Sequence, residues 1–422
     1  MTTVFVVVGR LRTLAVVTAL AGAASVAADG FEPAPTLTAS DLLPASLLRG
    51  PRHEVAGPVK ADGFLTAFTV KSSFGAWEAL DREMLQLRVE EVYALDKLSE
   101  ISKTEIFATA FGKAAAQKVA AIANVVADPV GTAKAVPGGV ARFARGLGRS
   151  AMVTADKLMA EKPGQGPDNR TTEQKAQAAA VAAGGAAESF LISGKRREWA
   201  GKVGADPYTT NQALADKLDD VGWAAYAGGF ALSVAAPSIP GLGMVETADT
   251  LVYQLPPAEL LKRNDDTLKA AGVGDAARKA LFVNGNFTPT LQTELAEAVA
   301  ALGGATGKSA VVTLAAQSRT EGDARYIRRC VQLLAMGGQE VGGWKALTTS
   351  QNEIEAVGAD GRLVLPWSVD YMTWNAETVP VDSASVKATR SREVWITGVA
   401  TARAKQELQA KGFTVVEKRP VK

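Results

Sequence analysis

The chain of 422 residues contains a single cysteine, Cys330, and a single histidine, His53. One cysteine excludes an intramolecular disulfide, and one Cys with one His cannot supply the ligands of a Cys/His zinc site. A histidine-dependent triad would rest entirely on His53, which lies in a proline-flanked segment expected to be a loop. We therefore expect no metal and no cofactor. Any catalysis would use carboxylates, a Ser/Lys arrangement or tyrosine.

The composition favours closely packed helices. Hydrophobic residues make up 47% of the chain, with alanine prominent among them, and there are 40 glycines. Such small side chains suit helices with small residues at their interfaces, and the length is enough for two or three domains.

The first residues have the three parts of a secretory signal in order. Arg10 and Arg12 are followed by an uncharged apolar run over 14–24, which is short for a membrane span, and then by small residues at 25–28. We expect a cleaved signal peptide over residues 1–27 of a bacterial protein that is periplasmic or secreted. An uncleaved N-terminal anchor is the alternative. Without a cysteine near the cleavage region, lipoprotein processing is not expected.

The charge balance gives no reason to expect nucleic acid as a partner. The chain has 46 basic and 44 acidic residues, and its first 27 residues contribute two arginines and no acid. The processed chain would be formally neutral, whereas nucleic-acid binding depends on an excess of basic groups.

Composition and periodicity divide the chain into regions. We expect a strand and helices over 28–160, a Pro/Gly-rich linker over 161–172, an Ala/Gly-rich helical region over 173–304 and a mixed region over 305–422. The expected fold class is α+β and predominantly α-helical. In the first region the predicted elements are a strand over 64–70 and helices over 76–99, 103–126 and 138–159.

The last third of the chain mixes helices and strands. Thr288 and Pro289 are typical of the start of a helix, which we expect to run to Leu302. We expect the final residues to form a β-α-β unit with parallel strands and a right-handed crossover. The other predicted elements are a strand over 310–314, a helix over 321–336 with Cys330 as a buried inert thiol, a strand over 362–371, and the tail elements 393–397, 401–410 and 413–416.

A segment over 303–309 looks like a phosphate-binding loop but does not match one. The pattern G-x-x-x-x-G-K-[ST] requires a glycine at position 302, which is Leu302. The segment also follows a predicted helix and precedes a predicted strand, the reverse of the required context. We interpret it as a flexible turn.

Glu91 projects into the middle of an apolar stripe on the helix predicted over 76–99. A carboxylate desolvated there would have a raised pKa unless a cation met it, and such groups serve as general acids. Arg88, three residues earlier, is the candidate partner, so a structural ion pair is the preferred interpretation. The stripe consists of Trp77, Leu80, Met84, Leu87, Leu95 and Leu98.

Two segments raise the question of membrane contact. Residues 138–150 form a basic amphipathic segment if helical, and this geometry suits an anionic lipid surface, although an ordinary solvated helix is favoured. Residues 221–245 carry no charge, but Pro237 and Pro240 interrupt them, so a buried hairpin is preferred over membrane insertion. The candidate lipid-facing residues of the first segment are Arg142, Phe143, Arg145, Leu147 and Arg149.

The densest aromatic cluster lies at 363–374. On a strand its alternate residues share one face, and Asp370 lies on the other. Trp367, Tyr371 and Trp374 are candidate glycan-facing residues beside that carboxylate. A face packed on the helix that contains Cys330 is the preferred alternative.

These features leave two hypotheses. The first is an exported, non-catalytic cell-envelope protein that binds a protein, lipid or glycan, with peripheral membrane contact as one form of that binding. The second is a carboxylate-dependent hydrolase acting on a cell-wall or extracellular substrate, for which Glu91 and Asp370 are the catalytic candidates. A hydrolase should place one of these carboxylates beside a second acid.

Overall fold

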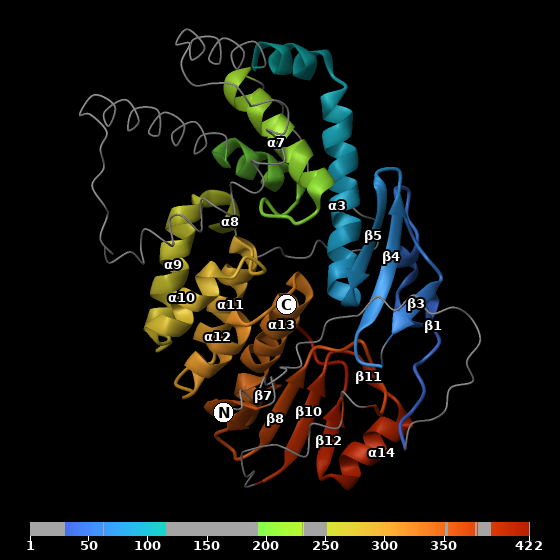
Figure 1. Ribbon diagram of the computed structural model, residues 1–422, viewed down its shortest axis with the longest axis vertical. Helices are drawn as coiled ribbons and strands as arrows, with labels where there is room; N and C mark the ends of the chain where they lie inside the picture. The colour runs from blue at the N-terminus through green and yellow to red at the C-terminus, as the bar shows by residue number, and fades with distance from the viewer. Residues whose placement is uncertain are drawn as a thin grey trace, which may run out of the picture.

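The fold is mixed α/β with helix as the larger part. Of the residues that the computed structural model describes, 53% are helical and 20% are in strands. Figure 1 shows an N-terminal sheet (blue) at the right, a C-terminal sheet (orange to red) at the bottom, and helices α9 to α13 to the left, above the C-terminal sheet. The described residues are 30–61, 63–114, 193–229, 231, 251–350, 353–375, 378 and 390–421.

The N-terminal sheet is antiparallel and centres on β4 (Thr66–Ser72). One edge of β4 pairs with β3 (Pro58–Ala61) and β2 (His53–Val55), and the other pairs with β5 (Gly75–Leu80). The short strand β1 (Leu37–Thr38) pairs with β3. The short helices α1 and α2 follow β1 and cover Ala39–Leu42 and Ala45–Leu48.

The helix predicted from Ala76 begins only at Asp81, so that boundary was wrong. Residues Gly75–Leu80 form β5, which pairs with β4 along its whole length. Trp77 and Leu80 therefore lie on a strand and not on the helical stripe. The apolar residues of such a short segment fit both the helical and the strand repeat, and its pairing with β4 makes it a strand.

Helix α3 (Asp81–Ser102) follows β5 directly and contributes side chains to two apolar cores. Its lower part shares a core with the N-terminal sheet, and its upper part shares one with α7 (Gln212–Ala227) and the helical residues 105–114 and 193–203. The long helix thus connects the first sheet to a helical layer (Figure 1).

Five further helices form a second layer around one apolar core. They are joined by short turns and lie against the C-terminal sheet, into which their core continues. The predicted helix after Thr288 is confirmed, and the Thr288 hydroxyl accepts a hydrogen bond from Leu291 N, as an N-cap residue should. The helices are α9 (Pro257–Ala270), α10 (Asp275–Val283), α11 (Pro289–Ala301), α12 (Lys308–Ala316) and α13 (Glu321–Gly337), with the short α8 (Leu251–Gln254) before them and the 3-10 helix Gly338–Val341 after them.

The strand predicted over 310–314 is wrong, because these residues lie in α12. Val311, Val312 and Ala315 are fully buried at helical spacing, against the same core as α10 and α13. The β-branched valines suggested a strand, but burial of one helical face outweighs the small difference in propensity.

The C-terminal sheet has the strand order β12-β10-β8-β7-β6. Its first three strands are parallel and the last two pair antiparallel. The predicted parallel β-α-β tail is confirmed as β10 (Arg392–Ile396), α14 (Ala402–Ala410) and β12 (Phe413–Val416). The remaining strands are β6 (Trp344–Ser350), β7 (Glu353–Gly358) and β8 (Leu363–Trp367), with the short parallel pair β9 (Tyr371–Met372) and β11 (Val399–Ala400) beyond the sheet.

Candidate functional site

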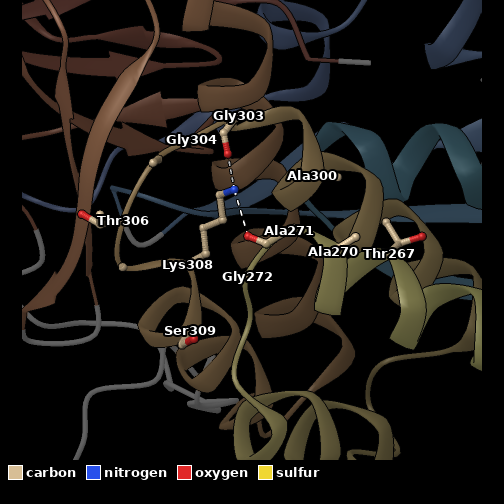
Figure 2. A pocket seen from close by; sticks show the side chains of 12 residues that line it. Thr267, Ala270, Ala271, Gly272, Ala300, Gly303, Gly304, Thr306, Lys308 and Ser309 are labelled. Atoms are coloured by element: carbon tan, nitrogen blue, oxygen red, sulfur yellow. Dashed lines mark hydrogen bonds between the residues drawn. The ribbon is translucent and has the colours of Figure 1, made fainter.

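A cavity of about 750 Å³ lies where the C-terminal ends of α9 and α11 meet the N-terminus of α12 (Figure 2). Eight of its twelve lining residues are glycine or alanine, and none is acidic. Its polar groups are three hydroxyls and one lysine. The lining residues are Thr267, Ala270, Ala271, Gly272, Ala300, Gly303, Gly304, Ala305, Thr306, Gly307, Lys308 and Ser309.

Lys308 ties two helix ends together. Its Nζ donates to the carbonyl oxygens of Ala271, at 3.1 Å, and of Gly303. These carbonyls close α9 and α11, where the helix dipole favours a positive charge. The side chain is buried, which lowers the pKa of the ammonium group. Figure 2 shows it pointing at the two carbonyls.

The segment over 303–309 is fixed by its neighbours and is not a phosphate-binding loop. It follows helix α11, as expected, but it opens α12 and does not lead to a strand. Thr306 N donates to Lys345 O at 3.1 Å and Leu347 N donates to Thr306 O at 2.9 Å, so the segment pairs with the edge strand β6. The strand-loop-helix order that phosphate binding requires is absent from this described part.

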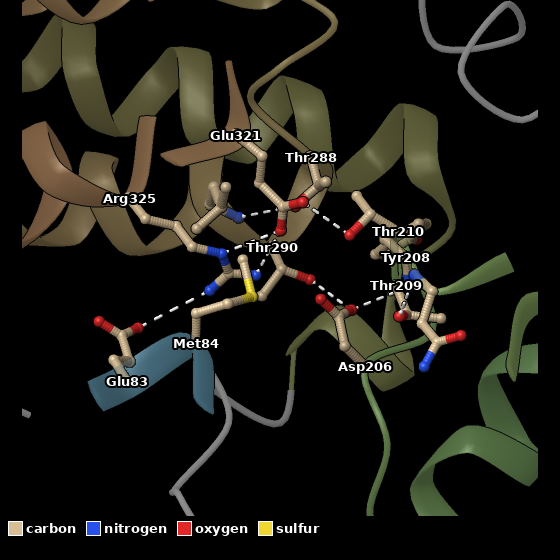
Figure 3. Close-up of polar contacts among 12 residues, drawn as sticks. Glu83, Met84, Asp206, Tyr208, Thr209, Thr210, Thr288, Thr290, Glu321 and Arg325 are labelled. Atoms are coloured by element: carbon tan, nitrogen blue, oxygen red, sulfur yellow. Dashed lines mark hydrogen bonds and ion pairs between the residues drawn. The ribbon is translucent and has the colours of Figure 1, made fainter. Parts of the chain in front are cut away.

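A second candidate is a set of buried ionic groups, which we name the junction cluster. It gathers side chains from α3, the 204–211 loop, α11, α13 and the residues after β8, all of which are distant in sequence. Figure 3 shows part of it, with Glu321 of α13 bonded to Thr210 of the loop and Arg325 between Glu321 and Glu83. Its members are Arg88, Arg325, Arg328, Arg329, Asp81, Glu83, Glu91, Asp206, Glu294, Glu321 and Asp370.

Glu91 lies in this cluster with its carboxylate fully engaged. Arg88 Nη1 lies 2.6 Å from Glu91 Oε2, so the expected ion pair is present, and both side chains are buried. Asn211 Nδ2 donates to Oε2 at 3.0 Å and the Thr209 hydroxyl donates to Oε1. With 1% of the residue exposed, Glu91 has no access to a substrate in this structure.

Glu83 is the centre of the cluster. It pairs with Arg328, with Arg329 Nε at 2.9 Å and with Arg325 Nη1 at 3.7 Å. Burial alone would raise the pKa of Glu83, but the charges of the three arginines outweigh it and lower the pKa to about 2. Glu83 is therefore an ionised structural anchor between α3 and α13.

Asp370 meets a second acid, Asp81, at the N-terminus of α3. Asp370 Oδ2 accepts hydrogen bonds from Thr66 Oγ1 at 2.6 Å and Arg82 N at 2.9 Å. Asp81 has a positive φ of 67° and pairs with Arg329 at 3.3 Å. Burial, together with the negative charges of Asp370 and Glu83, raises the pKa of Asp81 to about 6. No sequence pattern singles out Asp81, because it lies inside the helix predicted over 76–99.

Asp206 and Glu321 complete the cluster on the loop side. The Thr290 hydroxyl and Tyr208 N donate to Asp206 Oδ1 at 2.7 and 2.8 Å (Figure 3). Arg325 Nη2 lies 2.8 Å from Glu321 Oε1. The Thr210 hydroxyl donates to Glu321 Oε2 at 2.7 Å, so the 204–211 loop is attached to α11 through Thr290 and to the start of α13 through Glu321.

The candidate glycan-facing aromatics belong largely to a core. Trp367 is 1% and Trp374 is 6% exposed, and Tyr371 is half-buried. The Trp367 ring packs edge-on against Phe64 at 5.5 Å between centroids, within the core that also contains Leu408 of α14. Neither tryptophan presents a free ring face.

The proposed membrane contacts fall mostly beyond the described residues. The range 115–192 lies outside the described residues, and it contains Arg142, Phe143, Arg145, Leu147 and Arg149. Most of residues 221–245 also lie outside the described residues, in the range 232–250. Among the helices that the structure describes, none has the length and apolar content needed to cross a bilayer.

Comparison with protein-family models, with curated proteins and with solved structures finds no match to this chain. The geometry of the cavity and of the junction cluster is therefore the basis for a function.

Proposed function

We propose that the protein is an exported, non-catalytic binding protein of the cell envelope. The observation that supports this most is the engagement of Glu91. An ion pair and two further hydrogen bonds hold its carboxylate among side chains that join α3 to the 204–211 loop. A general acid needs access to its substrate, which a residue 1% exposed does not have.

The cavity between α9, α11 and α12 is the proposed binding site. Its volume of about 750 Å³ lies within the range of small-ligand sites, about 300–1,000 Å³. Hydroxyl groups of Thr267, Thr306 and Ser309 line it beside small apolar residues. Hydroxyls among small apolar groups suit a neutral, hydroxyl-rich ligand, so an envelope glycan fragment is the partner that we favour.

A cavity-filling variant tests this proposal. Gly304 has open space where a Cβ would lie, so Gly304→Trp should fill the cavity without backbone strain. Gly285 is equally open but does not line the cavity, and Gly285→Trp is the matched control. Calorimetric titration with cell-wall glycan fragments should show binding to the wild type and Gly285→Trp and a loss of at least tenfold in Gly304→Trp. Equal binding to all three would contradict the assignment of the cavity.

Export rests on the N-terminal sequence pattern alone and has its own test. N-terminal sequencing of the protein from periplasmic and secreted fractions should begin after Ala27 or Ala28. An intact Met1 in the cytoplasm would contradict export without affecting the proposed binding site.

One observation favours the hydrolase as a second candidate. Asp370 lies beside Asp81, whose pKa is raised to about 6, and a pair of carboxyl groups is the usual acid and base of such enzymes. Asp81→Asn and Asp370→Asn would then each abolish release of soluble fragments from cell-wall material. No release by the wild-type protein would exclude this candidate for that substrate.

A further inference from the structure

The junction cluster holds more acids than cations. Seven carboxyl groups face four arginines, so the carboxyl groups outnumber the arginines by three although several of them share an arginine. Most of these side chains are deeply buried, including Asp81, Asp206, Arg328 and Glu91, so water screens the excess only weakly. If all seven were ionised, the junction would carry a net negative charge in a medium of low dielectric constant.

Groups on the neighbouring elements do not remove this excess. Arg196 pairs with Asp219 at 2.5 Å and is balanced by it. Arg197 interacts with Tyr208 and with the carboxylate of Glu259, which lies outside the cluster. Arg82, whose backbone N–H donates to Asp370, has an exposed side chain.

Three acids in the cluster bind a proton more tightly than an ordinary carboxyl group does. Burial raises the pKa of Asp81, of Asp206 and of Glu294, and in each case a neighbouring carboxylate adds to the rise. For Glu294 the neighbours are Glu83 and Asp206. The carboxyl groups of the cluster outnumber its arginines by three. If the three acids with a raised pKa are protonated, the cluster is therefore electroneutral.

The cluster joins parts of the fold that are far apart in sequence. Asp81 and Glu83 begin α3, Arg325, Arg328 and Arg329 lie on α13, and their ion pairs link the two helices directly. Asp370 adds the residues after β8 through Thr66 and Arg82. A change of charge in the junction cluster therefore alters the interaction between two parts of the fold. One part is the N-terminal sheet together with α3, and the other is the rest of the chain.

We propose that the junction cluster is a pH-sensitive latch that is electroneutral and holds α3 against α13 in mildly acidic solution, and that loosens when its surplus carboxyl groups ionise. For Asp81 the direction follows from linkage. Its pKa rises from an ordinary 3.8 to about 6 on folding. The stability that it contributes is complete below pH 3.8 and is lost as the pH rises through about 6. This inference does not depend on the proposed function.

Urea denaturation of the full chain at steps from pH 4 to 8 tests the latch. Asp81→Asn replaces the acid by a neutral group of the same shape, and asparagine tolerates the positive φ at this position. Relative to wild type, the folding equilibrium constant of Asp81→Asn should rise on the order of a hundredfold between pH 4 and pH 8, as a shift of about two pKa units requires. Contributions from groups outside the cluster cancel in this comparison.

Asp360→Asn is the control, because Asp360 pairs with Arg362 outside the cluster and has a lowered pKa. Its difference from wild type should stay constant above pH 5. A constant difference for Asp81→Asn as well would overturn the latch.

If that variant fails to fold, infrared spectroscopy of wild type labelled with ¹³C-aspartate decides. A protonated aspartate present at pH 5 and lost by pH 7 is expected, and full ionisation at pH 5 would overturn the proposal.

Discussion

Arg88 and Glu91 lie one turn apart on α3 and form a buried ion pair of 2.6 Å. The pair also binds the 204–211 loop, because Arg88 Nη2 donates to Thr210 Oγ1 at 2.9 Å and Glu91 accepts from Thr209 and Asn211. A local pair on one helix thereby fixes a loop more than one hundred residues away in sequence.

Removing Glu91 should therefore cost stability. We expect Glu91→Ala to lower the free energy of unfolding by about 3–5 kcal/mol, because a buried arginine loses its partner. The double variant Arg88→Met with Glu91→Leu should recover part of this loss, but not all of it, since the Asn211 amide loses its acceptor. Urea denaturation measures both. Glu100→Ala, which breaks an exposed pair with Lys97 on the same helix, is the control and should cost less than about 1 kcal/mol. A double variant no more stable than Glu91→Ala would contradict the pair's role.

The single histidine should make the fold sensitive to acid. His53 is buried, its Nε2 lies 3.2 Å from Leu47 O and its Nδ1 has no hydrogen-bond partner in the described structure. Burial lowers the pKa of His53 below its ordinary 6.5. The unfolded chain then binds a proton more readily, so stability present above pH 6.5 falls as the pH drops toward the folded pKa. His53→Phe should lack this loss in urea denaturation. A histidine NMR signal that titrates at or above pH 6.5 in the folded protein would refute this account.

Gly307 should not tolerate a side chain. Its φ is +85°, and a Cβ there would lie 1.8 Å from Leu347 O. We expect Gly307→Ala to cost at least about 1–3 kcal/mol, since both backbone strain and a backbone clash oppose it. Gly304→Ala, nearby in open space, should change stability by less than about 0.5 kcal/mol. Thermal unfolding of the two variants compares them, and equal melting temperatures would show that the turn rearranges freely.

Vesicle binding tests the basic segment at 138–150, which stays a prediction from the sequence. If the segment contacts membranes, sedimentation with vesicles should require anionic lipid and weaken with salt. Reversing Arg142, Arg145 and Arg149 to glutamate should abolish the binding. Binding of equal strength to neutral vesicles would exclude an electrostatic contact.

Local signals in the sequence predicted several elements correctly. The Thr288-Pro289 start of α11, the helix around Cys330 and the parallel β-α-β tail are all present. Two predictions failed, at Gly75–Leu80 and at Ala310–Leu314. The apolar residues of each short segment fit both the helical and the strand repeat, so packing decides which structure forms. In the first case strand pairing prevailed, and in the second a buried helical face prevailed.

The candidate site was less accessible to prediction. The Arg88–Glu91 pair could be predicted because both partners lie on one helix, three residues apart. The remainder of the junction cluster could not, since Glu83 meets arginines more than 240 residues away in the chain. The cavity is likewise assembled from the ends of three helices, whose relative placement no local pattern contains.

Replacement of Glu83 tests most directly the central claim that the buried carboxylates hold the fold together. Glu83 contacts Arg325, Arg328 and Arg329, so Glu83→Gln should lower the free energy of unfolding by about 3–5 kcal/mol. Below its ordinary pKa of 4.5 the loss should shrink as the pH falls toward about 2, because the carboxyl group of the unfolded wild-type chain is then protonated while the folded one is still ionised. Urea denaturation between pH 2.5 and pH 7 measures this dependence. A loss of less than about 1 kcal/mol at pH 7, or one that does not change with pH, would contradict the claim.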